Sequence, residues 1–318
     1  GDRYWIDPNL EGVLRAVQQE REEAERARQE EAASKAEETY QIIQQAQLDQ
    51  PLPNGWTLFE HQRSAVEWLI THRKEGIYRG GILADHMGLG KTLSALVAAK
   101  ALSEYYQSPI FVVCPATLRE NWALEAAKIE CTIETYSWSK LPRPLDKQEY
   151  ILIADESHYA QNLKAKRTQQ LIDLATSENC RAAWLLTGTP LKNGRPVNLF
   201  PLLKAIDHPL GKDRWQYERR YCNGKHRNIG DKMIWDNSGA AHLDELAQKT
   251  QDCILRRTKA DCLDLPSKLR SLKPCDLVPK QLKAYKKEID DLVQDYRDRV
   301  AKGEVSEDAQ ALVTMGIL

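Results

Sequence analysis

The sequence predicts an α/β fold in which helices flank a sheet of parallel strands. Short continuous apolar runs, about four to six residues long, recur through the middle of the chain, and such runs are typical of strands buried on both faces. Amphipathic stretches of helical length separate the runs, which implies right-handed crossover connections. The predicted strands are Gly81–Ala84, Ile110–Cys114, Thr132–Tyr136, Tyr150–Ala154 and Ala182–Leu186.

The first part of the chain predicts a long charged helix. Residues from about Leu10 to Gln47 are rich in Glu, Gln, Arg and Ala and contain no Pro. Their apolar positions are sparse and mostly Ala, so they lack the sustained heptad seam of a strong coiled coil. We therefore expect residues 1–50 to form a helical extension, either solvated or joined to an upstream domain, with an unidentified protein partner. The segment Pro51–Gly55 ends this helix as a linker.

The pattern changes from Trp56 onward. Residues Phe59–His72 predict a helix with one apolar face, and the predicted strands follow it. Beyond Pro196 the apolar runs fade, and helical segments with Trp, Tyr and basic residues take over. We therefore expect a lobe at residues 51–195 and a helical subdomain at residues 196–318.

Composition limits the class of protein. With 42% hydrophobic residues, a chain of 318 residues can bury a sizeable core. No apolar run reaches the roughly 18–20 residues that span a bilayer, and the N-terminus lacks the basic and apolar segments of a signal peptide. The seven Cys residues form no Cys-x-x-Cys pair, which argues against a disulfide framework or a zinc site. We expect a soluble intracellular protein, cytoplasmic, nucleoid-associated or nuclear depending on its organism.

The net charge of −1 hides a gradient along the chain. Residues 1–50 carry six Lys and Arg against twelve Asp and Glu, whereas residues 181–290 carry twenty-two against thirteen. A local basic excess suits a polyanionic partner. A solvated basic face explains the same excess equally well, so charge alone leaves both interpretations open.

A glycine-rich loop stands between the first predicted strand and a helix predicted from Lys91 to about Leu102. Residues 85–92 read Asp-His-Met-Gly-Leu-Gly-Lys-Thr, a sequence whose backbone N–H groups can surround a phosphate at the N-terminus of that helix. In such a loop the lysine reaches the β- and γ-phosphates and the threonine hydroxyl ligates Mg²⁺. Gly-Lys-Thr is common by chance, and its position between a strand and a helix strengthens the interpretation. The expected nucleotide-binding residues are Gly88, Leu89, Gly90, Lys91 and Thr92.

Polar groups follow two later strands. Asp155 and Glu156 come directly after Tyr150–Ala154, at the strand end where ligands bind in open α/β sheets. We expect Asp155 to hold Mg²⁺ and Glu156 to orient and deprotonate an attacking water. An isolated Asp-Glu pair is more often a capped turn, and the upstream phosphate loop favours the chemical role. The segment Thr187–Pro190, after the last predicted strand, is by itself an ordinary turn.

Taken together and in this order, the motifs resemble those of the superfamily-two helicases. Asp155–His158 is similar to their Asp-Glu-x-His box, and Thr187–Pro190 is similar to their third motif. Four further stretches resemble the opening motif, motif Ia, motif Ib and the signature after the first lobe of the Swi/Snf-type ATPases: Leu58–Trp68, Phe111–Trp122, Thr135–Ser137 and Leu255–Lys268.

The resemblance implies the first RecA-like lobe of an ATP-driven translocase on double-stranded DNA, with ATP and Mg²⁺ as cofactors. It implies that Lys91, Asp155 and Glu156 are catalytic, that Thr92 and Asp155 hold Mg²⁺, and that Gln62 reads the adenine edge. The residues expected to couple hydrolysis to movement are His158, Thr187 and Thr189. The expected contacts to the DNA backbone are Thr117, Arg119, Ser137, Lys192 and Asn193, with a plain exposed charge as a nearly even alternative for the arginine and the lysine.

Five positions in or near the motifs carry further expectations. Asp85 stands where the strict phosphate-loop pattern has Gly, and we assign no role to His86. Ser157 stands where Ala or Gly is more usual, which favours the annealing-helicase branch over the nucleosome remodellers. We expect the pair Arg256–Arg257 to anchor the helical subdomain to the lobe through carboxylates.

The resemblance also implies a second RecA-like lobe in the same polypeptide, which supplies an arginine finger and further DNA contacts. The chain stops within an apolar pattern at Ala311–Leu318, so we expect it to be part of a longer protein in which residues 196–318 bridge the two lobes. We expect the chain alone to bind nucleotide weakly and to hydrolyse it slowly.

Two other functions remain open from the sequence. An RNA helicase of the Asp-Glu-x-His type has the same three motifs, but the stretch Leu255–Lys268 opposes it. A nucleotide-gated interaction module, with the N-terminal helix as its docking arm, is a different class. The intact set of Lys91, Asp155 and Glu156 favours hydrolysis over that module.

Overall fold

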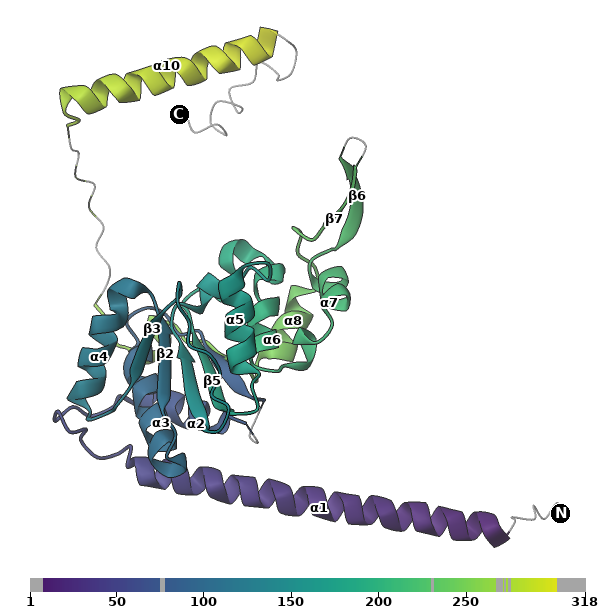
Figure 1. Ribbon diagram of the computed structural model, residues 1–318. Helices are drawn as coiled ribbons and strands as arrows, with labels where there is room; N and C mark the ends of the chain where they lie inside the picture. The colour runs from purple at the N-terminus through teal and green to yellow at the C-terminus, as the bar shows by residue number, and fades with distance from the viewer. Residues whose placement is uncertain are drawn as a thin grey trace. The chain divides into compact units, whose positions relative to one another are not determined.

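The computed structural model describes residues 8–74, 78–229, 232–266, 271, 273 and 276–301. It divides into two compact units, residues 1–265 and residues 266–318 (Figure 1). The first unit contains the sheet and all the predicted motifs except the end of the signature stretch, whose residues 267 and 268 lie outside the described residues. The apolar run at 311–318 also lies outside them. The second unit contains the helix α10 (Pro279–Ala301).

The sheet of the first unit has six strands in the order β3-β2-β4-β5-β1-β8, and every neighbouring pair is parallel. All five predicted strands are present, so the α/β prediction is confirmed. The third begins two residues later than predicted and is the only one of the five with no buried residue. The strands are β1 (Gly80–Leu83), β2 (Ile110–Cys114), β3 (Glu134–Ser137), β4 (Tyr150–Ala154), β5 (Cys180–Leu186) and β8 (Ile254–Leu255).

Helices cover both faces of this sheet, and successive strand residues contribute to opposite faces. On β2, Val112 packs into one buried apolar cluster and Val113 into the other. The first cluster lies under α2 (Glu60–Thr71), α3 (Lys91–Tyr106) and α4 (Arg119–Lys128). The second lies under α5 (Lys166–Ala175), α6 (Phe200–Ala205), α7 (Arg214–Tyr221) and α8 (Leu243–Thr250).

The prediction of helices alone beyond Pro196 is wrong for three segments. The strands β6 (Lys225–Ile229) and β7 (Lys232–Asp236) form an antiparallel hairpin. The strand β8 extends the main sheet beside β1, and residues up to 265 belong to the same compact unit as the sheet. The sequence did not predict β8 because its two residues are too few for a periodic signal. It did not predict β6 and β7 because they carry too many polar residues to resemble buried strands.

The N-terminal helix α1 (Pro8–Ala46) is present as predicted, and its last turns pack on α2 and α3. Ile42 is fully buried there, whereas the described side chains between residues 13 and 34 are exposed. A partner for that exposed part stays a prediction. None of the described helices is both long enough and apolar enough to cross a membrane.

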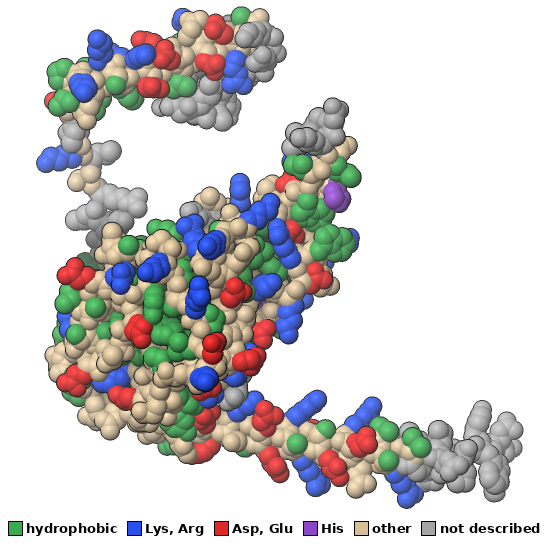
Figure 2. Space-filling model, in the orientation of Figure 1, with side chains coloured by type: hydrophobic (Ala, Val, Ile, Leu, Met, Phe, Trp, Pro, Cys, Tyr) green, Lys and Arg blue, Asp and Glu red, His purple; other side chains and the backbone are tan. Residues whose placement is uncertain are grey.

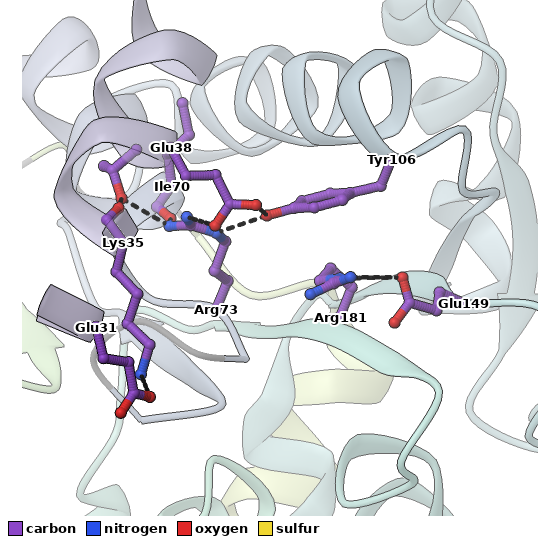
Figure 3. A network of polar contacts seen from close by, with 9 residues as sticks. Glu31, Lys35, Glu38, Ile70, Arg73, Tyr106, Glu149 and Arg181 are labelled. Carbon is purple, nitrogen blue, oxygen red and sulfur yellow. Dashed lines mark hydrogen bonds and ion pairs between the residues drawn. The ribbon is translucent and has the colours of Figure 1, made fainter. Parts of the chain in front are cut away.

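A buried arginine fixes α1 to the lobe (Figure 3). Arg73, just after α2, is fully buried and donates hydrogen bonds to Glu38 Oε2 at 2.8 Å and Thr39 Oγ1 at 3.0 Å. Tyr106 at the end of α3 donates to Glu38 Oε1 at 2.8 Å and accepts from Arg73 Nε at 3.1 Å. The same view shows Arg181 paired with Glu149 at 2.7 Å, which joins the start of β5 to the start of β4. The buried Arg73 guanidinium needs the Glu38 carboxylate, because an unpaired buried charge is strongly destabilising.

Replacement of Glu38 by alanine tests this anchor. Glu38→Ala leaves the buried Arg73 guanidinium without its carboxylate, so the free energy of unfolding is expected to fall by about 3 kcal/mol in urea denaturation. The control is Glu31→Ala, which removes a solvent-exposed ion pair with Lys35 from the same helix and is expected to leave stability unchanged. Equal urea midpoints for the two variants contradict the anchor.

Candidate nucleotide-binding site

Three of the predicted motifs lie at one edge of the sheet. The loop at 84–90 follows β1, Asp155 follows β4 and Thr187 follows β5. In the sheet β5 pairs with both β4 and β1, and all three strands run parallel. Their carboxyl ends therefore meet side by side, at the edge where open parallel sheets bind ligands.

The loop after β1 has the geometry of an anion cradle. Gly88 and Gly90 have φ values of 88° and 79°, in the left-handed region that favours glycine. A Cβ at Gly90 would lie 2.1 Å from Nε2 of Gln62, so no side chain fits there without a shift. Gly90 is also the N-cap of α3 and supplies no capping side chain. The first N–H groups of this 16-residue helix are therefore available to an anion such as phosphate.

The Lys91 ammonium is half-buried and is influenced by the charges of three carboxylates. Its Nζ donates to the backbone carbonyl of Asp85 at 2.7 Å. Burial lowers the pKa of Lys91, and the nearby charges of Asp85, Glu156 and Asp155 oppose that lowering. The fold thus brings Lys91 within electrostatic range of the acidic pair, although 64 residues separate Lys91 from Asp155 in the sequence.

Two tryptophans hold Asp155. Trp122 on α4 donates from Nε1 to Asp155 Oδ2 at 2.9 Å, and Trp138 donates to the Asp155 carbonyl at 2.9 Å. Burial raises the pKa of Asp155, and the Trp122 hydrogen bond lowers it. The sequence did not predict these positioning contacts. The one signal in the sequence that could have indicated them is the presence of the two tryptophans, because a buried indole N–H requires a hydrogen-bond acceptor.

Glu156 has a backbone conformation that is unusual for its residue type. Its φ of 50° and ψ of 47° lie in the left-handed region, which non-glycine residues occupy infrequently. Its side chain remains one-third exposed, so water reaches the carboxylate. His158 Nδ1 lies 3.0 Å from Glu156 Oε2 without the direction of a hydrogen bond. The imidazole therefore lies directly beside the carboxylate.

The loop after β5 is connected to the acidic loop through a glutamine that the sequence did not single out. Gln161, which follows the short helix η2 (Ser157–Ala160), donates from Nε2 to the carbonyls of Thr189 at 3.1 Å and Pro190 at 2.9 Å. Within the loop, the Thr187 hydroxyl accepts from the Thr189 N–H at 3.1 Å. Direct hydrogen bonds thus link the two loops.

A cavity of about 670 Å³ adjoins the phosphate loop. Gln62, Gly90 and Thr92 line it together with Phe59, whose ring is 62% exposed. Gln62 Oε1 accepts from the Phe59 N–H at 3.1 Å, which leaves the amide nitrogen of Gln62 beside Gly90. This volume falls within the usual range for small-ligand pockets, and a pocket with an aromatic face and an amide edge suits a base.

Arg257 pairs with a carboxylate of the lobe, as we expected from the sequence, and the structure identifies that carboxylate as Asp85. Asp85 is 2% exposed, and its Oδ1 accepts from Arg257 Nε at 3.1 Å and from the Arg257 backbone N–H at 2.9 Å. Arg257 also donates to the carbonyl of His61 at 2.6 Å. The pairing explains why position 85 is an aspartate. The same expectation is wrong for Arg256, which is exposed and donates to the carbonyl of Gly188 at 3.3 Å.

The predicted DNA-contacting residues fall into two groups. Thr117 and Arg119 follow β2, and Ser137 ends the adjacent strand β3, where it is in register with Cys114. Arg119 is exposed, and its Nε donates to the Thr135 hydroxyl at 3.3 Å. Asn193 is exposed in the short helix η3 (Lys192–Gly194) after β5, and the side chain of Lys192 lies outside the described part of the chain. All these positions are at the carboxyl edge of the sheet.

The Asp85–Arg257 pair gives a stability test. Arg257→Ala leaves the buried Asp85 carboxylate without its cation, so the free energy of unfolding is expected to fall by about 3 kcal/mol. Arg256→Ala changes the neighbouring arginine, which is exposed, and is expected to leave the free energy of unfolding unchanged. Urea denaturation of both variants measures the difference, and similar midpoints would show that the pair contributes nothing.

Comparison with known proteins identifies the family. Residues 61–148 and 133–317 match the SNF2-related domain family. The chain is 33% identical over 253 residues to the mouse DNA annealing helicase and endonuclease ZRANB3, covering 68% of this chain and 23% of that protein. It is 32% identical over 245 residues to the Caenorhabditis elegans homologue of the SWI/SNF-related regulator of chromatin subfamily A-like protein 1, covering 66% of this chain and 34% of that protein.

A solved structure agrees with these relatives. The Sulfolobus solfataricus SWI2/SNF2 ATPase core in complex with double-stranded DNA aligns with a TM-score of 0.54 and 25% identity, covering 79% of this chain and 56% of that one. This confirms the predicted RecA-like fold. The chain spans about a fifth to a third of the length of the curated relatives it matches. The comparisons do not favour the RNA-helicase or interaction-module alternatives, and similarity to annealing helicases supports that branch. The chain belongs to the SNF2 family of helicase-like ATPases.

Proposed function

We propose that this lobe binds Mg²⁺–ATP at the carboxyl edge of its sheet and, with a second lobe of the full-length protein, hydrolyses it to move along double-stranded DNA. One observation carries the proposal. Lys91, at a helix N-terminus that has no capping side chain, follows β1, and Asp155 and Glu156 follow β4 at the same edge of the sheet, where their charges oppose the lowering of the Lys91 pKa by burial. That combination of charges fits a triphosphate with a divalent cation.

Two sets of residues bind the two parts of the nucleotide, the base and the phosphates. The cavity beside Gln62 takes the base, with the Gln62 amide at its polar edge and the Phe59 ring as its stacking surface. Backbone N–H groups of residues 88–92 and the Lys91 ammonium take the phosphates. Thr92 and Asp155 would hold Mg²⁺, whose charge would neutralise part of the phosphate charge. The donor set fits this ion, because a hydroxyl and a carboxylate are oxygen ligands.

Glu156 acts on the water that attacks the terminal phosphate. Its carboxylate is reachable by solvent, and its strained backbone holds it beyond the end of β4. His158 lies directly beside the carboxylate, and Asp155 is kept in place by its two indole donors. Thr187 and Thr189 couple hydrolysis to movement, because the hydrogen bonds of Gln161 connect their loop to the loop that carries Asp155 and Glu156.

The partner of the lobe is the backbone of double-stranded DNA. The related Sulfolobus solfataricus core binds double-stranded DNA in its solved complex. The exposed residues Thr117, Arg119 and Asn193 and the end of β3 at Ser137 present hydroxyl, amide and guanidinium groups at one edge. Contacts of this kind go to phosphates, so affinity is independent of sequence and decreases with salt.

Replacement of Glu156 by glutamine tests hydrolysis in the full-length protein. Glu156→Gln keeps the shape of the side chain and removes the base, so DNA-stimulated ATP turnover is expected to fall about 10²–10⁴-fold while nucleotide affinity is unchanged. Turnover is measured by phosphate release and affinity by a fluorescent ATP analogue. Lys91→Ala is the matched variant, for which we expect loss of nucleotide affinity. Near-normal turnover in Glu156→Gln contradicts the assigned base.

A second test compares the chain with the full-length protein. Residues 1–318 alone are expected to hydrolyse ATP about 10³–10⁵-fold more slowly than the full-length protein on duplex DNA, because an arginine finger from a second lobe contributes a factor of that size. Duplex and RNA of the same sequence are compared as activators. Full DNA-stimulated turnover by the chain alone, or stimulation by RNA instead, argues against the two-lobe translocase.

A further inference from the structure

The hairpin β6–β7 extends outward from the end of α7 (Figure 1). An isolated two-stranded hairpin is marginally stable in water, so this one needs an anchor. Glu218 on α7, which is 3% exposed, provides it by accepting from Trp235 Nε1 at 2.6 Å and from Asn237 Nδ2 at 2.9 Å. At the base of the hairpin, a Cβ on Gly224 would lie 2.5 Å from the Trp235 ring. The orientation of Trp235 is therefore fixed.

A continuous row of aromatic side chains runs from α7 onto one face of the hairpin. Trp215 on α7 is 56% exposed and stacks with Trp235, with ring centroids 6.4 Å apart and an interplanar angle of 19°. His226 lies directly opposite Trp235 in the register and contacts it edge-on, at 5.1 Å. Met233, two residues before Trp235, lies on the same face and is 69% exposed.

A positive charge lies at the α7 end of this row. The Arg219 guanidinium lies 4.3 Å from the centroid of the Trp215 ring. Lys225 and Arg227 on β6 are exposed on the opposite face of the hairpin, the face that carries Ile234. Asp236, the one carboxylate among the described hairpin residues, is paired with Arg227 at 2.8 Å. Hydrophobic side chains together with Lys and Arg occupy this region of the surface in Figure 2.

These observations favour nucleic-acid bases over other ligands. Bases stack on aromatic rings whatever their sequence, and arginine beside the ring adds a cation–π contribution. A purely apolar protein surface would gain nothing from the guanidinium over Trp215. We propose that Trp215, Trp235, His226 and Arg219 form a stacking platform for unpaired bases of single-stranded DNA. The platform extends the proposed DNA-binding function and rests on it in part, since it adds base contacts to the phosphate contacts at the sheet edge.

The direct test measures binding of residues 1–318 to a fluorescein-labelled oligothymidylate by anisotropy at fixed salt. Trp215→Ala removes the exposed ring and leaves the Glu218 anchor intact. The affinity is expected to fall about tenfold, which corresponds to the loss of one stacked base. Trp215→Phe, which keeps an aromatic face, is expected to retain most of the affinity. Unchanged affinity in Trp215→Ala overturns the platform.

Two controls separate stacking from other effects. Ile234→Ala removes an apolar side chain, 41% exposed, from the opposite face of the same hairpin and is expected to leave the affinity unchanged. An abasic oligonucleotide retains the phosphates without the bases, so the unaltered chain and Trp215→Ala are expected to bind it equally weakly. Abasic binding as tight as oligothymidylate binding excludes stacking.

A blunt duplex distinguishes this proposal from the proposed function. Trp215→Ala is expected to bind the duplex as the unaltered chain does. If the unaltered chain does not bind duplex but its oligothymidylate affinity still depends on Trp215, the translocase proposal fails and the platform stands. If Trp215 affects binding to phospholipid vesicles or an acidic peptide and not to oligothymidylate, the platform fails and the translocase proposal is unaffected.

Discussion

The buried ion pair between Asp85 and Arg257 constrains the geometry of the whole site, because it joins segments 172 residues apart. Backbone hydrogen bonds reinforce it, from Ala84 N–H to the Leu255 carbonyl at 2.7 Å and from His86 N–H to the Arg257 carbonyl at 3.0 Å. A buried carboxylate is tolerated only when it is paired. A shift of β8 and the following Arg257 would therefore leave the Asp85 carboxylate buried without its cation, which is strongly destabilising. The segment Leu255–Arg257 is thereby held against the loop that we propose binds phosphate.

The candidate site is built from opposing electrostatic effects. Burial lowers the pKa of Lys91 and raises the pKa of Asp155, so the low-polarity surroundings disfavour both charges. Their mutual attraction and the Trp122 hydrogen bond oppose this. A site of this kind gains from a ligand that carries both signs of charge, and a magnesium-bound triphosphate is such a ligand.

Both elements that extend from the lobe are anchored by buried charged groups. Arg73 holds the end of α1, and Glu218 holds the base of the β6–β7 hairpin. Each buried group accepts or donates several hydrogen bonds with defined directions, which an apolar contact does not require. The directions in which the helix and the hairpin leave the lobe are therefore set by a few polar contacts.

The sequence by itself determined the strands β1–β5, the order of the motifs and the position of the glycine-rich loop after β1, because continuous apolar runs and glycine spacing are local signals. It also indicated that Arg257 needs a carboxylate. Only the tertiary structure decided which one, since Asp85 and Arg257 meet through the pairing of β1 with β8, a strand of two residues with no pattern of its own. The indole donors to Asp155 and the bridging Gln161 depend in the same way on loops from neighbouring strands meeting at one edge, and no periodicity along the chain encodes such contacts.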